Sequence, residues 1–182
     1  MEKKILIGRH LSLTTPDYLI GALKKAISYD ANSLMIYIGS PQTYFRRSLY
    51  DLKINEFKKC LYDTNLSIDN VIVHGSYLVN LANIKDNQKL LKSIEFMISD
   101  IKRMEYIGLK TLIIHPGSSL GEDKHKSLIN VSLSLNKILK ENNNVKIALE
   151  TMAGRSNELG SNFYEIKTII DNVDFKERVG VC

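Results

Sequence analysis

The stretch TLIIHPGSSLG, residues 111–121, carries the pattern that decides the fold. Three apolar residues after Thr111 suit a strand that is covered on both faces, as strands of parallel sheets are. Pro116 and Gly117 stop that strand, so His115 lies at its exit. One histidine at a strand end does not indicate a functional site unless the same pattern recurs along the chain.

The pattern does recur, because short apolar runs alternate with segments whose apolar residues repeat at helical spacing. Strands are predicted at 5–8, 33–38, 70–74, 109–115, 145–150 and 178–182. Helices are predicted from a Thr15 cap with Pro16 at the first helical position, over 54–63, over 86–107, around 128–138 and from a cap near Asn162.

Two of these helices have predicted ends or faces. Asp86 is the candidate cap of the longest helix, and Gly108 follows its last residue. In the last helix, Phe163, Ile166 and Ile170 are predicted to face inward.

The alternation predicts an α/β protein with a parallel sheet and right-handed crossovers. About five strand–helix units and the start of a sixth strand are present. By that count a doubly wound sheet could close, whereas a (β/α)8 barrel needs eight units and about 250 residues. The sequence shows no linker, low-complexity tract or repeat, so residues 1–182 are predicted to form one domain.

Composition narrows the class of protein. The chain has 44% hydrophobic and 25% charged residues, which is typical of a globular protein. A net charge of +5 and a pI near 9.1 favour anionic partners such as nucleic acid. Cys60 and Cys182 form neither a disulfide framework nor a CxxC motif. With no signal peptide and no apolar run of membrane-spanning length, we expect a cytoplasmic protein that does not bind membranes.

Functional groups gather at the carboxyl ends of parallel strands, and here those ends carry His10, His74, His115 and Glu150. Imidazole and carboxylate together are a zinc-type ligand set. The alternative is that each residue is a hydrogen-bonded structural residue or an exposed loop residue, and the spacing alone favours neither interpretation. The fourth histidine, His125, lies among charged residues and is predicted to be a solvated helix residue.

The loop HGSYLVNLA, residues 74–82, adds a second feature. Tyr77 and Leu78 either pack back against the sheet or form an aromatic and aliphatic pair that inserts into a DNA stack. Ser118 and Ser119 follow the next strand, but the spacing pairs no base with them, which disfavours a serine nucleophile.

At these motifs the sequence resembles the endonuclease IV family of apurinic/apyrimidinic (AP) endonucleases, the deoxyribonuclease IV class. The resemblance spans the whole chain. Its most specific motifs are, in this order, HGSYLVNLA at 74–82, HPGSSLG at 115–121, LETMAGRSNELG at 149–160 and RVGVC at 178–182. It implies a parallel (β/α)8 TIM barrel of the DNA-repair type. Such an enzyme hydrolyses the phosphodiester 5′ to an abasic site in double-stranded DNA and flips the abasic nucleotide out of the duplex.

The resemblance also implies a ligand set. The family uses three zinc ions, and by motif His74, His115 and Glu150 are implied metal ligands, with Glu150 as the catalytic, metal-bridging carboxylate. Zinc suits this chemistry because it lowers the pKa of a bound water and neutralises charge on the phosphate. In the family, further ligands follow RVGVC. We therefore expect a C-terminally truncated barrel that holds ligands for about one zinc plus half a bridge, inactive by itself and monomeric when complete.

The DNA-contacting residues implied by the resemblance lie on two loops and one strand end. The loop 74–82 penetrates DNA in the family, and IGSPQTYFRR, residues 38–47, belongs to another DNA-contacting loop. In that loop a glutamine stands where some members have arginine, and two arginines are expected to contact phosphates. The implied residues are Tyr77, Leu78, Gln42, Arg46, Arg47 and His10.

Two alternatives stay open. A metal-dependent sugar isomerase or epimerase barrel also places His and Glu at strand ends, although it has no need of the Tyr77–Leu78 pair or a basic surface. The second alternative is a non-catalytic zinc- or DNA-binding fragment, which would take up zinc without cleaving DNA.

Overall fold

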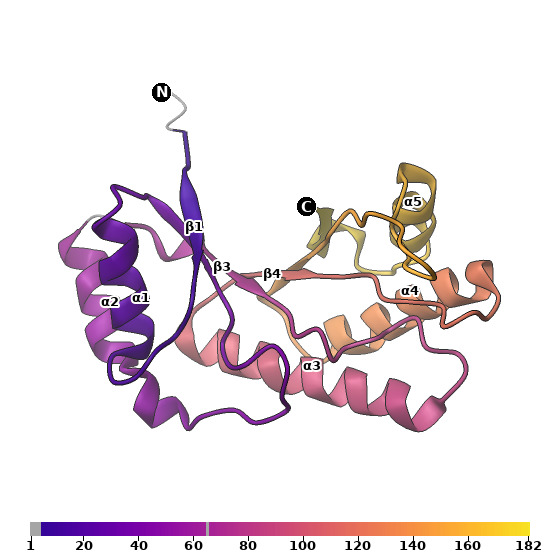
Figure 1. Ribbon diagram of the computed structural model, residues 1–182, viewed down its shortest axis with the longest axis horizontal. Helices are drawn as coiled ribbons and strands as arrows, with labels where there is room; N and C mark the ends of the chain where they lie inside the picture. The colour runs from indigo at the N-terminus through magenta and orange to yellow at the C-terminus, as the bar shows by residue number, and fades with distance from the viewer. Residues whose placement is uncertain (1–4, 65) are drawn as a thin grey trace.

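A computed structural model describes residues 5–64 and 66–182, and its centre is one sheet of six parallel strands (Figure 1). Neighbouring strands of the sheet follow one another in sequence, and helical segments connect them. The strands are β1 (Gly8–Leu11), β2 (Ser33–Ile36), β3 (Val71–His74), β4 (Thr111–Ile114), β5 (Lys146–Leu149) and β6 (Val179–Val181). The α-helices are α1 (Tyr18–Ile27), α2 (Ile54–Asp63), α3 (Asn87–Ile107), α4 (Lys124–Lys140) and α5 (Phe163–Asp171). Short 3-10 turns cover Leu49–Leu52, Ile68–Asn70 and Lys176–Arg178.

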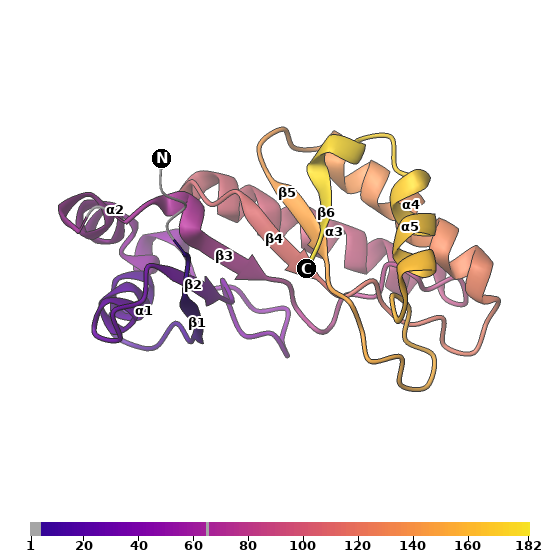
Figure 2. The ribbon, with the colours of Figure 1, turned by 90° about the horizontal axis from the view of Figure 1, so that it is seen from above.

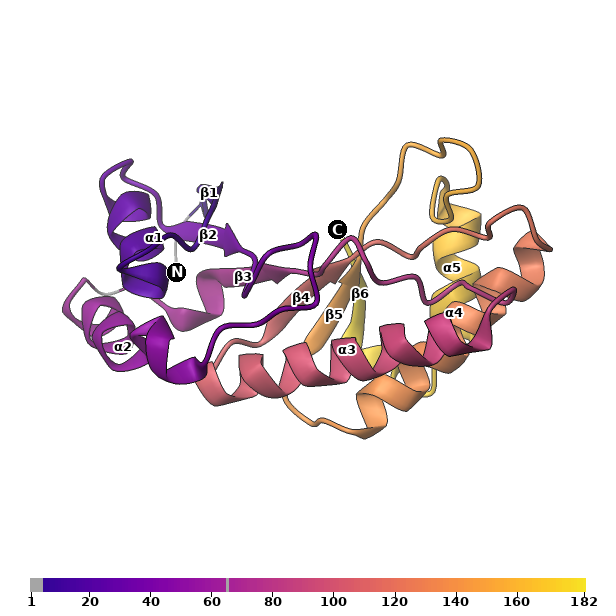
Figure 3. The same cartoon turned by 60° about the horizontal axis from the view of Figure 1, so that its bottom comes forward.

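The sheet is wound as in a barrel. All five strand pairs are parallel, and the strand order never reverses. A doubly wound sheet would need such a reversal, with helices on both faces. Figures 2 and 3 instead show the helices along the outer side of a curved sheet. The doubly wound alternative is therefore wrong. The incomplete (β/α)8 barrel, with five strand–helix units and a sixth strand, is confirmed.

The hydrophobic core lies between the sheet and the helices. Strand residues such as Ile36, Val73 and Leu112 belong to the same buried cluster as Phe57 of α2 and Ile101 of α3. Burying each such side chain stabilises the fold by roughly 1.5–3 kcal/mol. The strand ends that carry the candidate site are thus attached to a rigid frame.

The longest helix has the predicted ends. Asp86 accepts a hydrogen bond from the backbone N–H of Lys89, and Gly108 ends α3 with a φ of 99°. That left-handed conformation is one that glycine adopts without steric cost. Among the described residues, no helix, α3 included, is both long enough and apolar enough to cross a membrane.

The first strand begins later than predicted. The prediction of a strand at 5–8 rested on the apolar run, but the ladder with β2 joins Gly8–Leu11 to Ser33–Ile36. The side chains of Ile5, Leu6 and Ile7 are 76%, 55% and 66% exposed. Pairing with β2 and burial of Leu11 set the strand, and the apolar run lies outside the core.

The first helix also begins later. The prediction of a Thr15 cap and Pro16 at the first helical position is wrong, because α1 starts at Tyr18 and its N-cap residue is Asp17. The Thr15–Pro16 bond is cis, and Tyr18 has a positive φ of 42° that breaks helical geometry at that point. The turn is closed by the Tyr18 N–H, which donates to the Thr14 carbonyl.

In the last helix, Asn162 is the N-cap as predicted, and its side chain accepts from the Glu165 N–H. Ile166 is buried and Ile170 is partly buried against the core, as predicted, and Ile169 is buried with them, whereas Phe163 is 82% exposed. The prediction that Phe163 faces inward is therefore wrong. Phe163 is the first residue of α5, and the buried residues of this helix follow it at Glu165, Ile166 and Ile169.

Candidate metal centre

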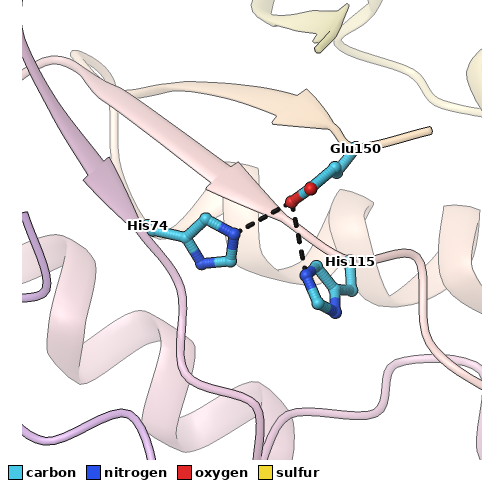
Figure 4. Close-up of side chains that lie close together, drawn as sticks. All are labelled: His74, His115 and Glu150. Carbon is cyan, nitrogen blue, oxygen red and sulfur yellow. Dashed lines mark hydrogen bonds and ion pairs between the residues drawn. The ribbon is translucent and has the colours of Figure 1, made fainter. Parts of the chain in front are cut away.

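Three successive strands bring three candidate ligands to one edge of the sheet. His74 is the last residue of β3, His115 directly follows β4, and Glu150 directly follows β5. Because these strands are parallel neighbours, their carboxyl ends meet at the same edge. Figure 4 shows the three side chains converging there.

The distances among the three side chains fit a zinc ion. Oε2 of Glu150 lies 2.9 Å from Nε2 of His74 and 3.3 Å from Nε2 of His115. One ligand atom from each residue lies within 4.8 Å of the others. Zinc binds such atoms at about 2.0–2.2 Å in a tetrahedron, which puts two ligands about 3.3 Å apart. Two imidazoles and a carboxylate at these spacings are a donor set that suits zinc.

The contacts of the two His74 ring nitrogens are those of a metal-binding histidine. Its Nδ1 lies 2.9 Å from the Gly75 carbonyl oxygen, which only accepts, so this nitrogen carries the proton. In the neutral ring, Nε2 then directs a lone pair at the Glu150 carboxylate. Two acceptors 2.9 Å apart require a proton or a metal ion between them. The backbone contact of Nδ1 is the arrangement that orients a metal-binding histidine.

The environment of His115 favours the neutral ring that a metal ligand needs. Burial lowers its pKa below the ordinary value of 6.5, Glu150 opposes that shift, and His74 adds to it. His115 is 30% exposed and Glu150 is 36% exposed, so solvent reaches this side of the cluster, while His74 is buried. A substrate can therefore approach from the His115 and Glu150 side.

Tyr37 is a neighbour of the candidate metal site of His74, His115 and Glu150 that the sequence interpretation missed. Its hydroxyl donates to the Tyr77 hydroxyl at 2.6 Å, and its ring lies 5.2 Å from that of His74. Burial, and then the hydrogen bond to Tyr77, raises the pKa of Tyr37 well above its ordinary value. The apolar run 33–38 hid this tyrosine because an aromatic residue at a strand end is typical of packing.

The predicted wedge residue Tyr77 lies beside the cluster. Its ring centroid is 5.4 Å from that of His115 and 5.9 Å from that of His74, and the residue is 55% exposed. Leu78 is half-buried. Both interpretations of the loop have a basis here, because Tyr77 packs against the site and also faces solvent.

His10 lies within β1, where the sequence interpretation had placed it two residues beyond the first strand. Its ring centroid is 4.5 Å from that of Tyr37 and 6.1 Å from that of His74. It is not among the three grouped ligands of the described residues. The fourth histidine, His125, is exposed in the first turn of α4, as predicted.

The loop 38–47 places its polar residues differently. Gln42 and Arg47 are exposed, and the Arg47 guanidinium lies 5.3 Å from the ring centroid of Tyr18. Arg46 is 9% exposed and forms a two-point ion pair with Asp100 of α3, at 2.8 Å and 2.9 Å. Nε and Nη2 of Arg46 donate to Asp100 and Nη1 donates to carbonyls of its own loop, which disfavours the expected phosphate contact of Arg46, and that contact stays a prediction.

The loops after β3 and β4 are joined by one side chain. The Asn80 amide donates to the Ser118 carbonyl at 2.9 Å, and its oxygen accepts from the Ser118 N–H at 3.0 Å. A cavity of about 240 Å³ lies beside this link, lined by Tyr77, His115 and Glu158 among others. The Ser118 hydroxyl accepts from the Leu120 N–H, which gives it a turn-forming role.

Comparison with known proteins places the chain in a family. A family model described as the xylose isomerase-like TIM barrel matches residues 23–182, and the chain belongs to this family. Curated relatives within it carry the name "Probable endonuclease 4". Those of Ureaplasma urealyticum and Acholeplasma laidlawii are 41% identical over 184 residues and 37% identical over 180 residues. The predicted resemblance to endonuclease IV is confirmed.

The alignments cover 100% and 98% of this chain but 60% and 61% of those relatives, so the chain spans about 60% of their length. Solved structures support the fold. Endonuclease IV from Thermus thermophilus matches with a TM-score of 0.77 at 23% identity, covering 91% of this chain and 59% of that one. A D-psicose 3-epimerase from Clostridium cellulolyticum matches with a TM-score of 0.72 at 20% identity, covering 96% and 61%.

Proposed function

We propose that this chain belongs to a zinc-dependent DNA-repair endonuclease that hydrolyses the phosphodiester 5′ to an abasic site. The observation that carries the proposal is the convergence of His74, His115 and Glu150 on one point at the strand ends. The names of the curated relatives support a nuclease. The net charge of +5 suits a polyanionic substrate.

In this proposal the two imidazoles and the carboxylate would hold zinc, and Glu150 would be the ligand shared with a second ion. Zinc supplies Lewis-acid neutralisation of charge on the scissile phosphate. The chain itself fixes the His74 tautomer through the Gly75 carbonyl and keeps His115 neutral through burial. The neutral ring of His115 is the form whose nitrogen can bind a metal ion.

Four exposed or half-exposed residues are the proposed DNA contacts. Tyr77 and Leu78 lie on the loop beside the cluster, and Tyr77 offers an exposed ring that can stack in the gap left by a flipped abasic nucleotide. Gln42 and Arg47 are exposed on the neighbouring loop and can reach the phosphate backbone. His10 is proposed to line the same edge through its contact with Tyr37.

A sugar epimerase is the second candidate, favoured by the fold similarity to D-psicose 3-epimerase. The nuclease is preferred because the relatives named endonuclease 4 are 37–41% identical to the chain, whereas that epimerase is 20% identical. The two functions differ in the substrate that must reach the cluster, so substrate turnover separates them.

The test is a nicking assay on an end-labelled duplex with a single abasic site, in zinc and in chelator. It compares the 182-residue chain with a chain extended by the remaining C-terminal segment of the Ureaplasma urealyticum relative. We expect the extended chain alone to cut, 5′ to the lesion and only with zinc, and its Glu150→Gln variant to be inactive. Cutting by the shorter chain as well would show that fewer ligands suffice. A folded, zinc-loaded extended chain that leaves the duplex intact and epimerises a ketohexose would overturn the proposal.

A further inference from the structure

Asp100 lies on α3, between His74 and His115 in the sequence, and it is buried and pairs with Arg46. Arg Nε donates to Oδ1 at 2.8 Å and Nη2 donates to Oδ2 at 2.9 Å. The guanidinium also lies 4.4 Å from the ring centroid of Phe96. A two-point pair stacked on an aromatic ring fixes the orientation of an arginine better than a single contact does.

The remaining donors of Arg46 hold its own loop. Nη1 donates to the carbonyls of Ser40, Thr43 and Phe45 at 3.1, 2.9 and 3.0 Å. Gly39 makes room for this arrangement, because a Cβ there would lie 2.6 Å from Arg46 Cδ. The loop 39–46 therefore wraps around a guanidinium that α3 holds in place.

This loop in turn holds the loop that carries Tyr77. The Pro41 carbonyl accepts from the Ser76 hydroxyl at 2.7 Å and from the Tyr77 N–H at 3.1 Å. The Tyr77 ring then packs beside His115, and its hydroxyl accepts from Tyr37. A continuous set of contacts thus leads from α3 through Arg46 and Pro41 to the residue next to the metal cluster.

We propose that Asp100 and Arg46 are positioning residues that fix the two proposed DNA-contacting loops, 38–47 and 74–82, relative to each other and to the cluster of His74, His115 and Glu150. The inference rests on the proposed function for its DNA-binding consequence. Its structural part does not, because the contacts join the two loops whatever the substrate is. Neither residue touches DNA in this proposal.

The alternative role for Arg46 is a direct phosphate contact, and the two roles predict different responses. If Arg46 is a positioning residue, Asp100→Asn weakens binding to an abasic duplex as strongly as Arg46→Leu does. The dependence of affinity on salt stays unchanged in both variants. If Arg46 contacts phosphate, Arg46→Leu lowers the slope of log K against log[salt] by about 0.9, and Asp100→Asn leaves affinity unchanged or higher.

Hydrogen exchange followed by mass spectrometry on the zinc-loaded 182-residue chain tests the structural part first. We expect Asp100→Asn to speed exchange at least tenfold in peptides covering 38–47 and 74–82, with peptides covering 111–115 and 145–150 unchanged. Glu95→Gln, an exposed acid on the same helix, is the matched control and should change none of these peptides. Asp100→Glu, which keeps the carboxylate, should restore part of the protection.

Binding to a duplex that contains a tetrahydrofuran abasic analogue tests the consequence. We expect Asp100→Asn to lose at least tenfold in affinity while zinc affinity stays within twofold of wild type. Unchanged exchange at 74–82, or faster exchange throughout the chain in both Asp100→Asn and Asp100→Glu, would overturn the positioning role. If Asp100→Asn speeds exchange only in the two loops but the wild-type chain does not bind the duplex, the positioning role stands and the proposed function is rejected.

Discussion

Two histidines of this chain differ mainly in where the fold places them. His74 is buried at the end of β3 with both ring nitrogens engaged, and His125 is exposed on α4. We expect His74→Ala to weaken zinc binding about 100-fold or more, because a lost ligand leaves two donors. His125→Ala should bind zinc as wild type does. Competition against a chromophoric chelator measures both, and equal affinities in the two variants would contradict the site.

Gly117 has a backbone conformation and a close contact with Asn80 that a side chain at this position would disturb. Its φ is 111°, and a Cβ there would lie 2.3 Å from Oδ1 of Asn80, the side chain that joins two ligand-bearing loops. We expect Gly117→Ala to lower the free energy of unfolding by about 1–3 kcal/mol and to weaken zinc binding. The control is Gly180→Ala, where a Cβ would meet no atom within 4 Å. Urea denaturation of both variants decides, and equal stabilities would refute this account of the glycine.

At the scale of elements, the start of α5 depends on one carboxylate. Glu165 accepts from the N–H groups of Gly160 and Ser161 and pairs with Lys124 of α4. Burial alone would raise the pKa of Glu165, but Lys124 and the two N–H groups together lower it below its ordinary value of 4.5. A lowered folded-state pKa means that the stabilisation is complete above the unfolded-state value and is lost as pH falls through the folded-state value.

We therefore expect Glu165→Gln to be about 1–3 kcal/mol less stable than wild type at neutral pH. The difference should narrow as pH falls from the ordinary pKa of 4.5 through the lower folded-state pKa, at which the carboxyl of the folded wild type takes up its proton. Asp63→Asn, at an exposed position, controls for the loss of a charge. Thermal unfolding across pH provides the measurement. A difference that is constant from pH 7 to pH 3 would contradict the ionised role of Glu165.

Element prediction from the sequence succeeded where local chemistry sets the boundary. Asp86 and Gly108 end α3 through their own hydrogen bond and backbone conformation, so they were readable in advance. The start of β1 and the inward face of α5 depend on contacts with distant residues. Gly8 pairs with Ser33, and Phe163 faces solvent while the buried residues of its helix follow at Glu165, Ile166 and Ile169. The periodicity of apolar residues does not indicate those distant partners.

At the scale of the whole molecule, the site was more predictable than its supports. His74, His115 and Glu150 were identified because each ends a strand, and a parallel sheet brings strand ends together. The sequence does not indicate the role of Asp100, because an acidic residue in the middle of a helix is usually solvent-exposed. A basic loop residue such as Arg46 is typical of DNA contacts, so its ion pair with Asp100 is not predictable from the sequence. Strand count alone left doubly wound and barrel sheets open, and the strand order decided between them.

The central claim is that three strand–helix units build one zinc site from two imidazoles and a carboxylate. X-ray absorption at the zinc edge, on the zinc-loaded 182-residue chain, tests it most directly. The account predicts a first shell of nitrogen and oxygen only, at about 2.0–2.2 Å, with imidazole scattering that falls in His74→Ala. A sulfur neighbour at about 2.3 Å would instead place zinc on Cys60 or Cys182 and contradict the claim.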